Sequence, residues 1–151
     1  MQTRRETLKH SAVVAGLLAS AGFLPQNALA YSADAFKAKT VADTLKALGS
    51  AAPVESKDVV IGGPDIAENG AVVPLTASTT LPGVKKVLIL VEKNPAALVA
   101  LFNVTDSVEA NFATRSKMGQ SSDVYAVAIM NDGKALFAKK EVKVTLGGCG
   151  G

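Results

Sequence analysis

The residue with the clearest potential for chemistry is the single cysteine, Cys149, two positions before the last residue of the sequence. It is flanked by two glycines on each side, Gly147, Gly148, Gly150 and Gly151. A thiolate is a nucleophile that forms and breaks bonds to sulfur, and glycine leaves the backbone free to take many conformations. Because an extended chain gains about 3.3–3.6 Å per residue, the thiol reaches about 10 Å beyond the strand-like run 142–146. The pattern predicts a thin arm that carries a thiol into a partner's cleft.

The same five residues also fit two simpler roles. Chain ends are commonly disordered, so a glycine-rich end fits an inert tail, and a lone cysteine fits an intermolecular disulfide. An ordinary cysteine thiol has a pKa of about 8.5 and is only a few per cent ionised at pH 7. The flanking glycines do nothing to lower that pKa. We therefore hypothesise that Cys149 is unreactive when free and is activated only in a partner's electropositive cleft.

The composition removes most catalytic and metal-binding alternatives. The only histidine is His10, which lies in the export signal predicted below, and there is no tryptophan and no second cysteine. A Cys–His nucleophile pair, a His/Cys zinc site and haem attachment through C-x-x-C-H cannot then be assembled from the mature chain. Metal delivery by Cys149 with Met118 or Met130 is a weak alternative, because one thiolate with dispersed thioethers rarely makes a selective site. We expect no cofactor, no metal and no catalytic residue in this chain.

The first residues carry a twin-arginine export pattern. Arg4 and Arg5 stand in the run Thr-Arg-Arg-Glu-Thr-Leu-Lys, which is typical of the Tat pathway, although Thr7 takes a position where a bulky apolar residue is common. A short apolar stretch rich in alanine and glycine follows, and then an A-x-A cleavage site formed by Ala28 and Ala30. This order is that of a secretory signal peptide, and the apolar stretch is short for a membrane span.

We expect residues 1–30 to be removed on export to the periplasm, with an uncleaved signal anchor as the alternative. The remaining chain suits one domain. The sequence has 16 basic and 13 acidic residues, but the basic excess lies largely in the signal, so the mature chain is close to neutral. No basic patch or aromatic platform favours nucleic acid, and we expect no membrane contact for the mature form.

A helix is predicted over residues 31–50. Apolar residues recur there at helical spacing, Ser32 or Asp34 can cap the start, and Gly49 can end the helix in the left-handed conformation. The apolar face is narrow, so the helix should lie against a surface. That surface is either the chain's own sheet, which we favour, or a partner.

Short strand patterns separated by turn residues follow from Pro53 onward. The run 87–91 is continuously apolar, as expected of a strand that is buried on both faces. Asn69-Gly70 predicts a β-hairpin, and Leu81-Pro82-Gly83 and Asn131-Asp132-Gly133 predict further turns. The predicted strands are 58–61, 71–76, 84–91, 98–104, 109–118, 124–130 and 135–146.

Closely spaced short strands favour an all-β fold, an immunoglobulin-like antiparallel β-sandwich. We expect this sandwich over residues 51–146, after the short N-terminal helix, and a flexible carrier arm over 147–151.

The last predicted strand is rich in lysine. Lys139, Lys140 and Lys143 stand in it, and charged residues protect exposed strands from unwanted pairing. We therefore predict an edge strand. Attraction of anionic substrates is the alternative role for these lysines.

Four segments carry a resemblance to a known family. The most specific is residues 142–151, which contains Gly-Gly-Cys-Gly-Gly, and the others are residues 64–74, 90–95 and 114–122. Together they resemble the SoxY family, the sulfur-carrier subunits of the bacterial thiosulfate-oxidising Sox system. The similarity covers essentially the whole mature domain. Ser116 stands where an apolar residue is expected, which concerns packing rather than the reactive end.

The resemblance implies a periplasmic protein of immunoglobulin-like fold that forms a tight heterodimer with a second β-sandwich subunit, SoxZ. It implies that Cys149 is the covalent attachment site for thiosulfate-derived sulfur. In that scheme a c-type cytochrome couples thiosulfate oxidatively to the thiol, a hydrolase releases sulfate, and a molybdenum-haem sulfane dehydrogenase, where present, oxidises the remaining sulfur. This chain is then a carrier and not an enzyme. The alternative is a structural or adhesive immunoglobulin-like domain whose terminal thiol forms an intermolecular disulfide.

Overall fold

The computed structural model describes residues 32–145. The predicted signal peptide, with Arg4, Arg5, Ala28 and Ala30, lies outside the described residues, and so do Cys149 and its four glycines. The predictions made on those residues therefore remain predictions.

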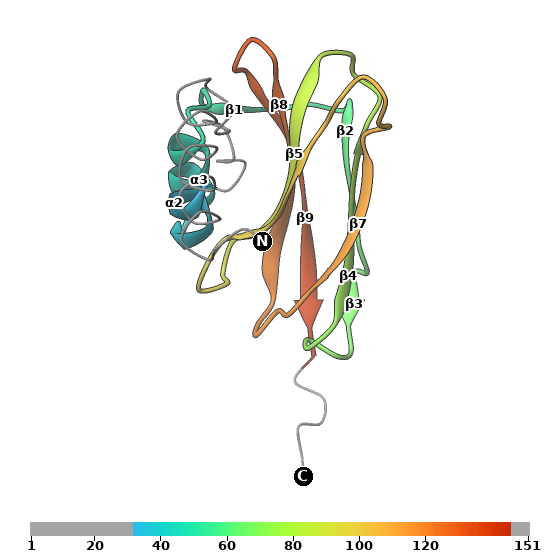
Figure 1. The fold of residues 1–151 in the computed structure, drawn as a ribbon. Coiled ribbons are helices and arrows are strands. Elements are labelled where there is room, and N and C mark those ends of the chain that lie inside the picture. Colours follow the sequence, from blue (N-terminus) through green and yellow to red (C-terminus); the bar gives the residue numbers. More distant parts are fainter. Residues whose placement is uncertain (1–31, 146–151) are drawn as a thin grey trace, which may run out of the picture. The chain divides into compact units, whose positions relative to one another are not determined.

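Two short helices and nine strands make up the described part of the chain (Figure 1). The helices are α2 (Ala33–Lys37) and α3 (Val41–Ala47). The strands are β1 (Pro53–Glu55), β2 (Val59–Gly62), β3 (Ile66–Ala67), β4 (Val73–Thr79), β5 (Val84–Val91), β6 (Leu98–Asn103), β7 (Asn111–Ser116), β8 (Ser122–Met130) and β9 (Ala135–Val144).

The strands form two sheets that face each other. The larger sheet has the order β1-β9-β8-β5-β6, with β3 also paired to β9, and the smaller sheet has the order β2-β4-β7. An apolar core fills the space between them, with members from both sheets such as Leu75 of β4, Ile89 of β5 and Val142 of β9. The predicted all-β, immunoglobulin-like sandwich is confirmed, and the seven predicted strands are found with ends within three residues of the predicted ones.

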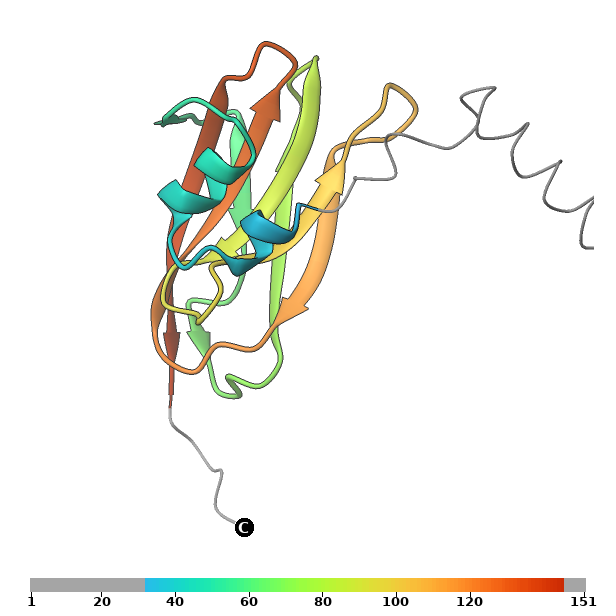
Figure 2. The same ribbon diagram turned by 60° about the vertical axis from the view of Figure 1, so that its left-hand side comes forward.

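β5 is buried on both of its faces, as its continuous apolar run predicts. Side chains alternate across a strand, so Val87 and Ile89 enter the core between the sheets while Leu88 and Leu90 point the other way. Leu88 and Leu90 belong to a second apolar cluster with Leu45 of α3. Figure 2 shows α2 and α3 against this outer face of the larger sheet. The prediction that the helical segment packs on the chain's own sheet is therefore confirmed.

The single predicted helix over 31–50 is wrong in one respect, because the structure has two helices there. The chain is extended at Ala38, with φ −64° and ψ 135°, and Thr40 starts α3 as its N-cap. The Oγ1 of Thr40 accepts a hydrogen bond from the Asp43 amide at 3.1 Å, and such local bonds compete with a continuing helix. Gly49 ends the segment at φ 68°, as predicted.

The prediction that the last strand is an edge strand is also wrong. β9 pairs with β8 on one side, and on the other side with β1 near its start and with β3 near its end. β1 and β3 are three and two residues long and run parallel to β9. Segments this short have no readable period, so nothing in their sequence indicated that they would cover this strand.

The turn predictions have mixed outcomes. Gly83 and Gly133 have φ of 76° and 85°, in the left-handed region that glycine favours, and the turn at Gly133 joins the antiparallel strands β8 and β9. The hairpin predicted at Asn69-Gly70 is wrong, because the chain turns there without pairing the strands on either side: β3 pairs with β9, and β4 pairs with β2 and β7. Neither described helix is long and apolar enough to cross a membrane.

Candidate functional site

The predicted arm follows directly from the end of β9. Thr145 is the last described residue and stands four positions before Cys149. The structure therefore bears on the site through the part of the sandwich that holds the end of β9, at the lower end of the fold in Figure 1.

Two backbone hydrogen bonds attach the end of β9 to the segment around β3. The amide of Lys143 donates to the carbonyl of Asp65 at 2.9 Å, and the amide of Thr145 donates to the carbonyl of Ala67 at 3.1 Å. The hydroxyl of Thr145 also donates to Ala67 O at 3.4 Å. The last described residue is thus still bonded to the sandwich.

The opposite flank is held by a serine side chain. The amide of Val144 donates to Oγ of Ser121 at 2.9 Å, so the amides of three successive residues, 143–145, all have acceptors. Saturated backbone groups resist local opening. The described end of β9 is therefore held in a fixed position.

Gly70 lies at a close approach between this end of β9 and the loop that contains Ser121. The Met118 amide donates to Gly70 O at 2.7 Å. A Cβ on Gly70 would overlap the carbonyl oxygen of Met118 and lie 2.8 Å from Cγ1 of Val144. Only glycine fits here without a shift of the backbone, which accounts for Asn69-Gly70 without a hairpin.

Two of the three predicted edge lysines are bound to carboxylates. Lys140 Nζ lies 2.8 Å from Asp65 Oδ1 and donates to Gly63 O at 2.7 Å, which connects β9 to the chain after β2. The hydrogen bond from Lys140 to the Asp65 carboxylate, together with the charge of Lys140, holds the pKa of Asp65 below its ordinary value of 3.8. Lys139 lies 3.0 Å from Asp123, whose carboxylate raises the pKa of Lys139. These contacts favour a structural role for the two lysines over attraction of anions.

A third segment supports the loop from the other side. Asn94 Nδ2 donates to the carbonyl of Lys117 at 2.9 Å, and the amide of Lys93 donates to Oγ of Ser122 at 3.0 Å. Lys93 and Asn94, which follow β5, therefore support the loop that holds Val144.

These contacts bring together all the segments that carry the family resemblance. Residues 64–74, 90–95 and 114–122 are far apart in the sequence, yet each contributes contacts around the described end of residues 142–151. We call residues 63–70, 117–122 and 142–145 the arm base. The shared residues of the resemblance thus lie where the predicted arm begins.

Comparison with known proteins identifies the family. The family model described as "Sulfur oxidation protein SoxY" matches residues 44–149, well over half of the chain. The chain belongs to the SoxY family. The match includes Cys149, and family membership supports a carrier role in sulfur oxidation rather than a role as an enzyme.

A solved structure agrees with this assignment. The sulfur carrier protein SoxY from Chlorobium limicola f thiosulfatophilum is 36% identical with a TM-score of 0.59, over 65% of this chain and 88% of that chain. Superoxide reductase (neelaredoxin) from Ignicoccus hospitalis is 17% identical with a TM-score of 0.51, over 58% of this chain and 80% of that chain. At that identity the second likeness shows the fold alone. No curated protein matches the chain significantly in sequence.

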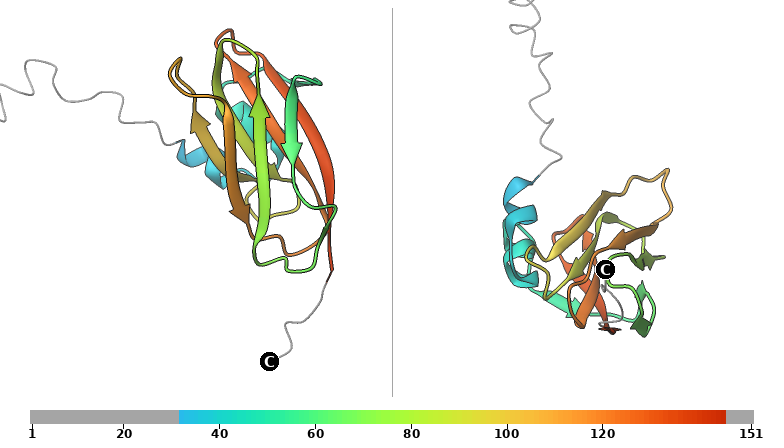
Figure 3. Two further views of the ribbon diagram at one scale, coloured as in Figure 1. Left: turned by 90° about the vertical axis from the view of Figure 1, so that its right-hand side faces the viewer. Right: turned by 90° about the horizontal axis from the view of Figure 1, so that it is seen from below.

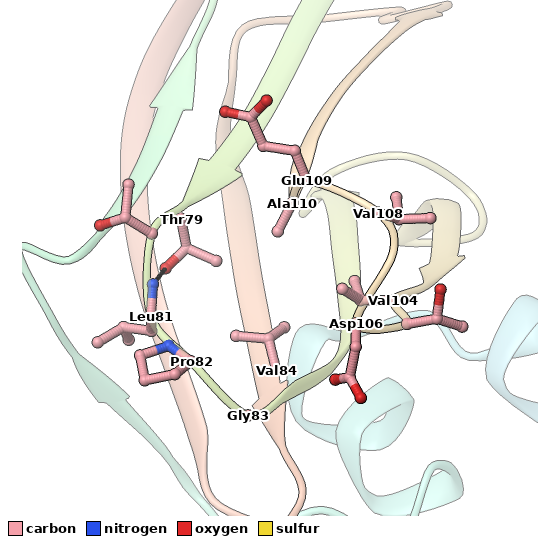
Figure 4. Close-up of a pocket in the computed structure, with 12 residues that line it drawn as sticks. Thr79, Leu81, Pro82, Gly83, Val84, Val104, Asp106, Val108, Glu109 and Ala110 are labelled. Carbon is pink, nitrogen blue, oxygen red and sulfur yellow. Dashed lines mark hydrogen bonds between the residues drawn. The ribbon is translucent and has the colours of Figure 1, made fainter.

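A cavity of about 430 Å³ lies at the other end of this SoxY-family sandwich (Figure 4). The turn before β5 and the loop between β6 and β7 line it, and its polar groups include the carboxylates of Asp106 and Glu109. The hydroxyl oxygen of Thr79 is occupied as acceptor of the Leu81 amide at 3.2 Å. The residues that line the cavity lie at the end of the fold where β8 turns into β9, away from the arm base. We therefore do not expect Cys149 to act in this cavity.

The remaining candidates among the described residues serve packing. Met118 is 1% exposed in the core between the sheets, and Met130 packs against the same core, which argues against the two thioethers as metal ligands together with Cys149. No group of three or more His, Cys, Asp or Glu residues gathers within residues 32–145. Ser116, expected to be apolar in the family, is 6% exposed, and its hydroxyl donates to the carbonyl of Lys117 at 3.1 Å. The hydroxyl is thereby accommodated in a buried position.

Two residues of the arm base, Asp65 and Ser121, were not singled out from the sequence, and Gly70 was predicted only as part of a hairpin turn. Their roles come from contacts between distant parts of the chain, as in the hydrogen bonds of Thr145 with Ala67, 78 positions apart. No spacing rule reports such a contact. The one available indication was that they fall inside the segments that resemble the family.

Proposed function

We propose that this chain is an exported, periplasmic carrier that holds sulfur-oxidation intermediates covalently on Cys149 and presents them to the enzymes of thiosulfate oxidation. The observation that carries the proposal is the arm base. The segments on which the sequence resemblance rests converge on the end of β9, and Gly-Gly-Cys-Gly-Gly follows Thr145 after one residue. This arrangement suits a fixed support followed by an adaptable tether.

The first step of the proposed cycle is an oxidative coupling. The Cys149 thiol and thiosulfate form a disulfide bond, giving Cys–S–S–SO₃⁻ with the loss of two electrons and of the thiol proton. A c-type cytochrome partner accepts the electrons, because residues 32–145 hold no histidine or cysteine to ligate a redox centre. The chain supplies the nucleophile and its position, and the partner supplies the oxidant.

The later steps leave sulfur on the arm. Hydrolysis of the sulfur–sulfonate bond by a partner hydrolase consumes water and releases sulfate, so that Cys–S–S⁻ remains on Cys149. A sulfane dehydrogenase partner, where present, removes six electrons from the outer sulfur while three water molecules supply the oxygens of the sulfonate, giving Cys–S–SO₃⁻. A second hydrolysis then releases sulfate and restores the thiol. The steps take place in several different proteins, which suits glycines that allow the arm to adapt to unlike clefts.

We propose that the chain forms a heterodimer with a SoxZ-like β-sandwich subunit, which stays bound while the arm enters one partner enzyme after another. The thiol of Cys149 is expected to be unreactive until a partner's cationic cleft stabilises its thiolate. Alkylation rates of the isolated chain test this expectation, and a strongly depressed thiol pKa there would contradict it.

The deciding experiment is intact mass spectrometry of the protein from thiosulfate-grown cells. We expect a mature chain that begins at Tyr31 and carries added sulfur or sulfonate on its C-terminal peptide. The variant Cys149→Ser should lack every adduct and abolish thiosulfate oxidation, with unchanged thermal unfolding. A protein that shows only an intermolecular disulfide dimer and never an adduct would instead support the adhesive role.

The glycines provide a second test. Gly148→Ala and Gly150→Ala should leave thermal stability unchanged, because we expect both residues to belong to the flexible arm, but should slow loading by at least one partner. Loading rates equal to wild type with every partner would count against the arm.

A further inference from the structure

The two lateral sides of the sandwich are closed to different degrees. On one side β1 and β3 pair with the two ends of β9, over residues 135–137 and 143–144, and Lys140 connects the middle of β9 to Gly63; β2 is the last strand of the smaller sheet on this side. On the other side β6 and β7 are the last strands of their sheets, and no described segment pairs with the outer edge of either one. Figure 3 shows β6 and β7 along one side of the fold and β2 and β9 along the other.

β7 offers a regular edge. All six of its residues pair with β4 without a register shift. The Thr79 amide donates to Ala110 O at 2.9 Å, and in an antiparallel pair the bonded positions alternate. Phe112 and Thr114 therefore bond to β4, while the N–H and C=O groups of Ala113 and Arg115 point away from it. Within residues 32–145 neither residue has a hydrogen-bond partner on that side, and both side chains are exposed.

The edge of β7 also lacks the usual protection. Natural edge strands are commonly guarded by lysine, proline or a bulge. β6 has a register shift against β5, whereas β7 has no shift, no lysine and no proline, and Arg115 is its only charged residue. An unguarded edge of this kind is suited to pairing with another chain.

An apolar contact lies beside this edge. Phe102 of β6 and Phe112 of β7 stack with their ring centroids 4.3 Å apart and their planes within 3°, and both are only partly buried. Partly exposed aromatic side chains are enriched at protein interfaces. The same side of the sandwich thus combines free backbone groups with an apolar anchor.

β7 also leads into the arm base. Its last residue, Ser116, is followed at once by residues 117–122, the loop whose Ser121 accepts from the Val144 amide. A partner seated along β7 would therefore border the support of the predicted arm.

We propose that the outer edge of β7 is where the β-sandwich partner docks, by adding one of its own extended strands to the sheet β2-β4-β7. This rests on the proposed function, which supplies a β-sandwich partner. The occupant is specified by chemistry, because a row of free N–H and C=O groups at strand spacing is satisfied by an extended backbone. The small outward-facing side chains of Asn111 and Ala113 leave space for the partner's side chains.

Amide exchange measured by NMR tests this with internal controls. In the isolated chain the amides of Ala113 and Arg115 exchange fast, whereas those of Phe112 and Thr114 are protected by β4. In the complex with a co-expressed SoxZ-like subunit, the first pair should slow at least tenfold and the second pair should stay protected. If the amides of Ala113 and Arg115 exchange at the same rate in the formed complex as in the isolated chain, the proposal is overturned. It is also overturned if their protection in the isolated chain grows with protein concentration, because a second copy of the chain would then occupy the edge.

A matched pair of variants gives an independent test. Ala113→Pro removes an N–H that makes no bond to β4, so the chain's own ladder loses no hydrogen bond, whereas Ala113→Ser keeps the N–H. We expect the affinity for the SoxZ-like subunit to fall at least tenfold in the proline variant only. Equal affinities of the two variants overturn the docking site. If the complex leaves this edge free and Cys149 still carries adducts, the docking site is refuted and the carrier function is retained. If native protein carries no adducts, the carrier function itself is refuted.

Discussion

Replacing Gly70 by alanine should destabilise the arm base. The added Cβ would overlap the carbonyl oxygen of Met118 and lie 2.8 Å from Cγ1 of Val144. Ordinary carbon–carbon contacts lie at about 3.5–4.0 Å, so the valine methyl has to retreat by about 1 Å. The Met118 carbonyl has less freedom, because the amide of the same residue is bonded to Gly70 O at 2.7 Å.

The expected cost is that of an overpacked site, about 1–3 kcal/mol. With a urea dependence of about 1–3 kcal/mol per molar for a domain of this size, the unfolding midpoint should fall by about 1 M. Amide exchange of Val144 and Thr145 should accelerate more than that of the central strands, since the strain acts on the end of β9. Loading of Cys149 should also slow if the direction of the arm depends on this support.

Gly119→Ala is the matched control. Gly119 lies in the loop that faces Gly70, but a Cβ there meets no atom within 4 Å. The two substitutions therefore add the same methyl group to neighbouring parts of the arm base and differ only in the space available. If both variants unfold at the same urea concentration, the close approach at Gly70 is not a constraint and the reasoning fails.

Three further results are expected. An NMR titration should place the pKa of Asp65 below 3.8 in the wild-type chain and nearer 3.8 in the variant Lys140→Met. Because the folded state has the lowered pKa, the ion pair contributes to stability above about pH 3.8. That contribution is lost as the pH falls through the folded-state pKa. Leu45→Ala should cost about 2–5 kcal/mol in urea unfolding, as for other large-to-small changes of fully buried residues, because Leu45 is 2% exposed between α3 and the sheet. Replacing Arg4 and Arg5 together by lysine should leave uncleaved protein in the cytoplasm in a fractionation assay, and normal export would contradict the twin-arginine assignment.

The sequence predicted those parts of the fold that repeat a local pattern. The apolar run of β5 indicated burial on both faces, and Gly49, Gly83 and Gly133 all take the left-handed conformation expected at a helix end or a turn. Each of these depends on a few adjacent residues, so sequence reasoning could predict it.

The errors arose where contacts at a distance decided the structure. β1 and β3 are too short to show a period, yet they pair with the two ends of β9, so that β9 is not the last strand of its sheet. Asn69-Gly70 looked like a hairpin turn because the dipeptide permits one, whereas Gly70 is required by the approach of Met118 and Val144. The thiol was evident from composition alone, but its support consists of backbone contacts that only the fold brings together.

The arm base and the free edge of β7 have one loop in common. Residues 117–122 continue directly from β7, receive the side-chain bond from Asn94 and hold Val144 through Ser121. A strand added to β7 would order the start of this loop, and any shift in the loop would reach Val144 through a single side-chain hydrogen bond. Ordering that starts at the partner's strand would therefore extend to the base of the arm without passing through the core. In the proposed complex the paired subunit would thus act on the support of Cys149, and the predicted flexibility of the glycines would let the arm adapt to each enzyme in turn.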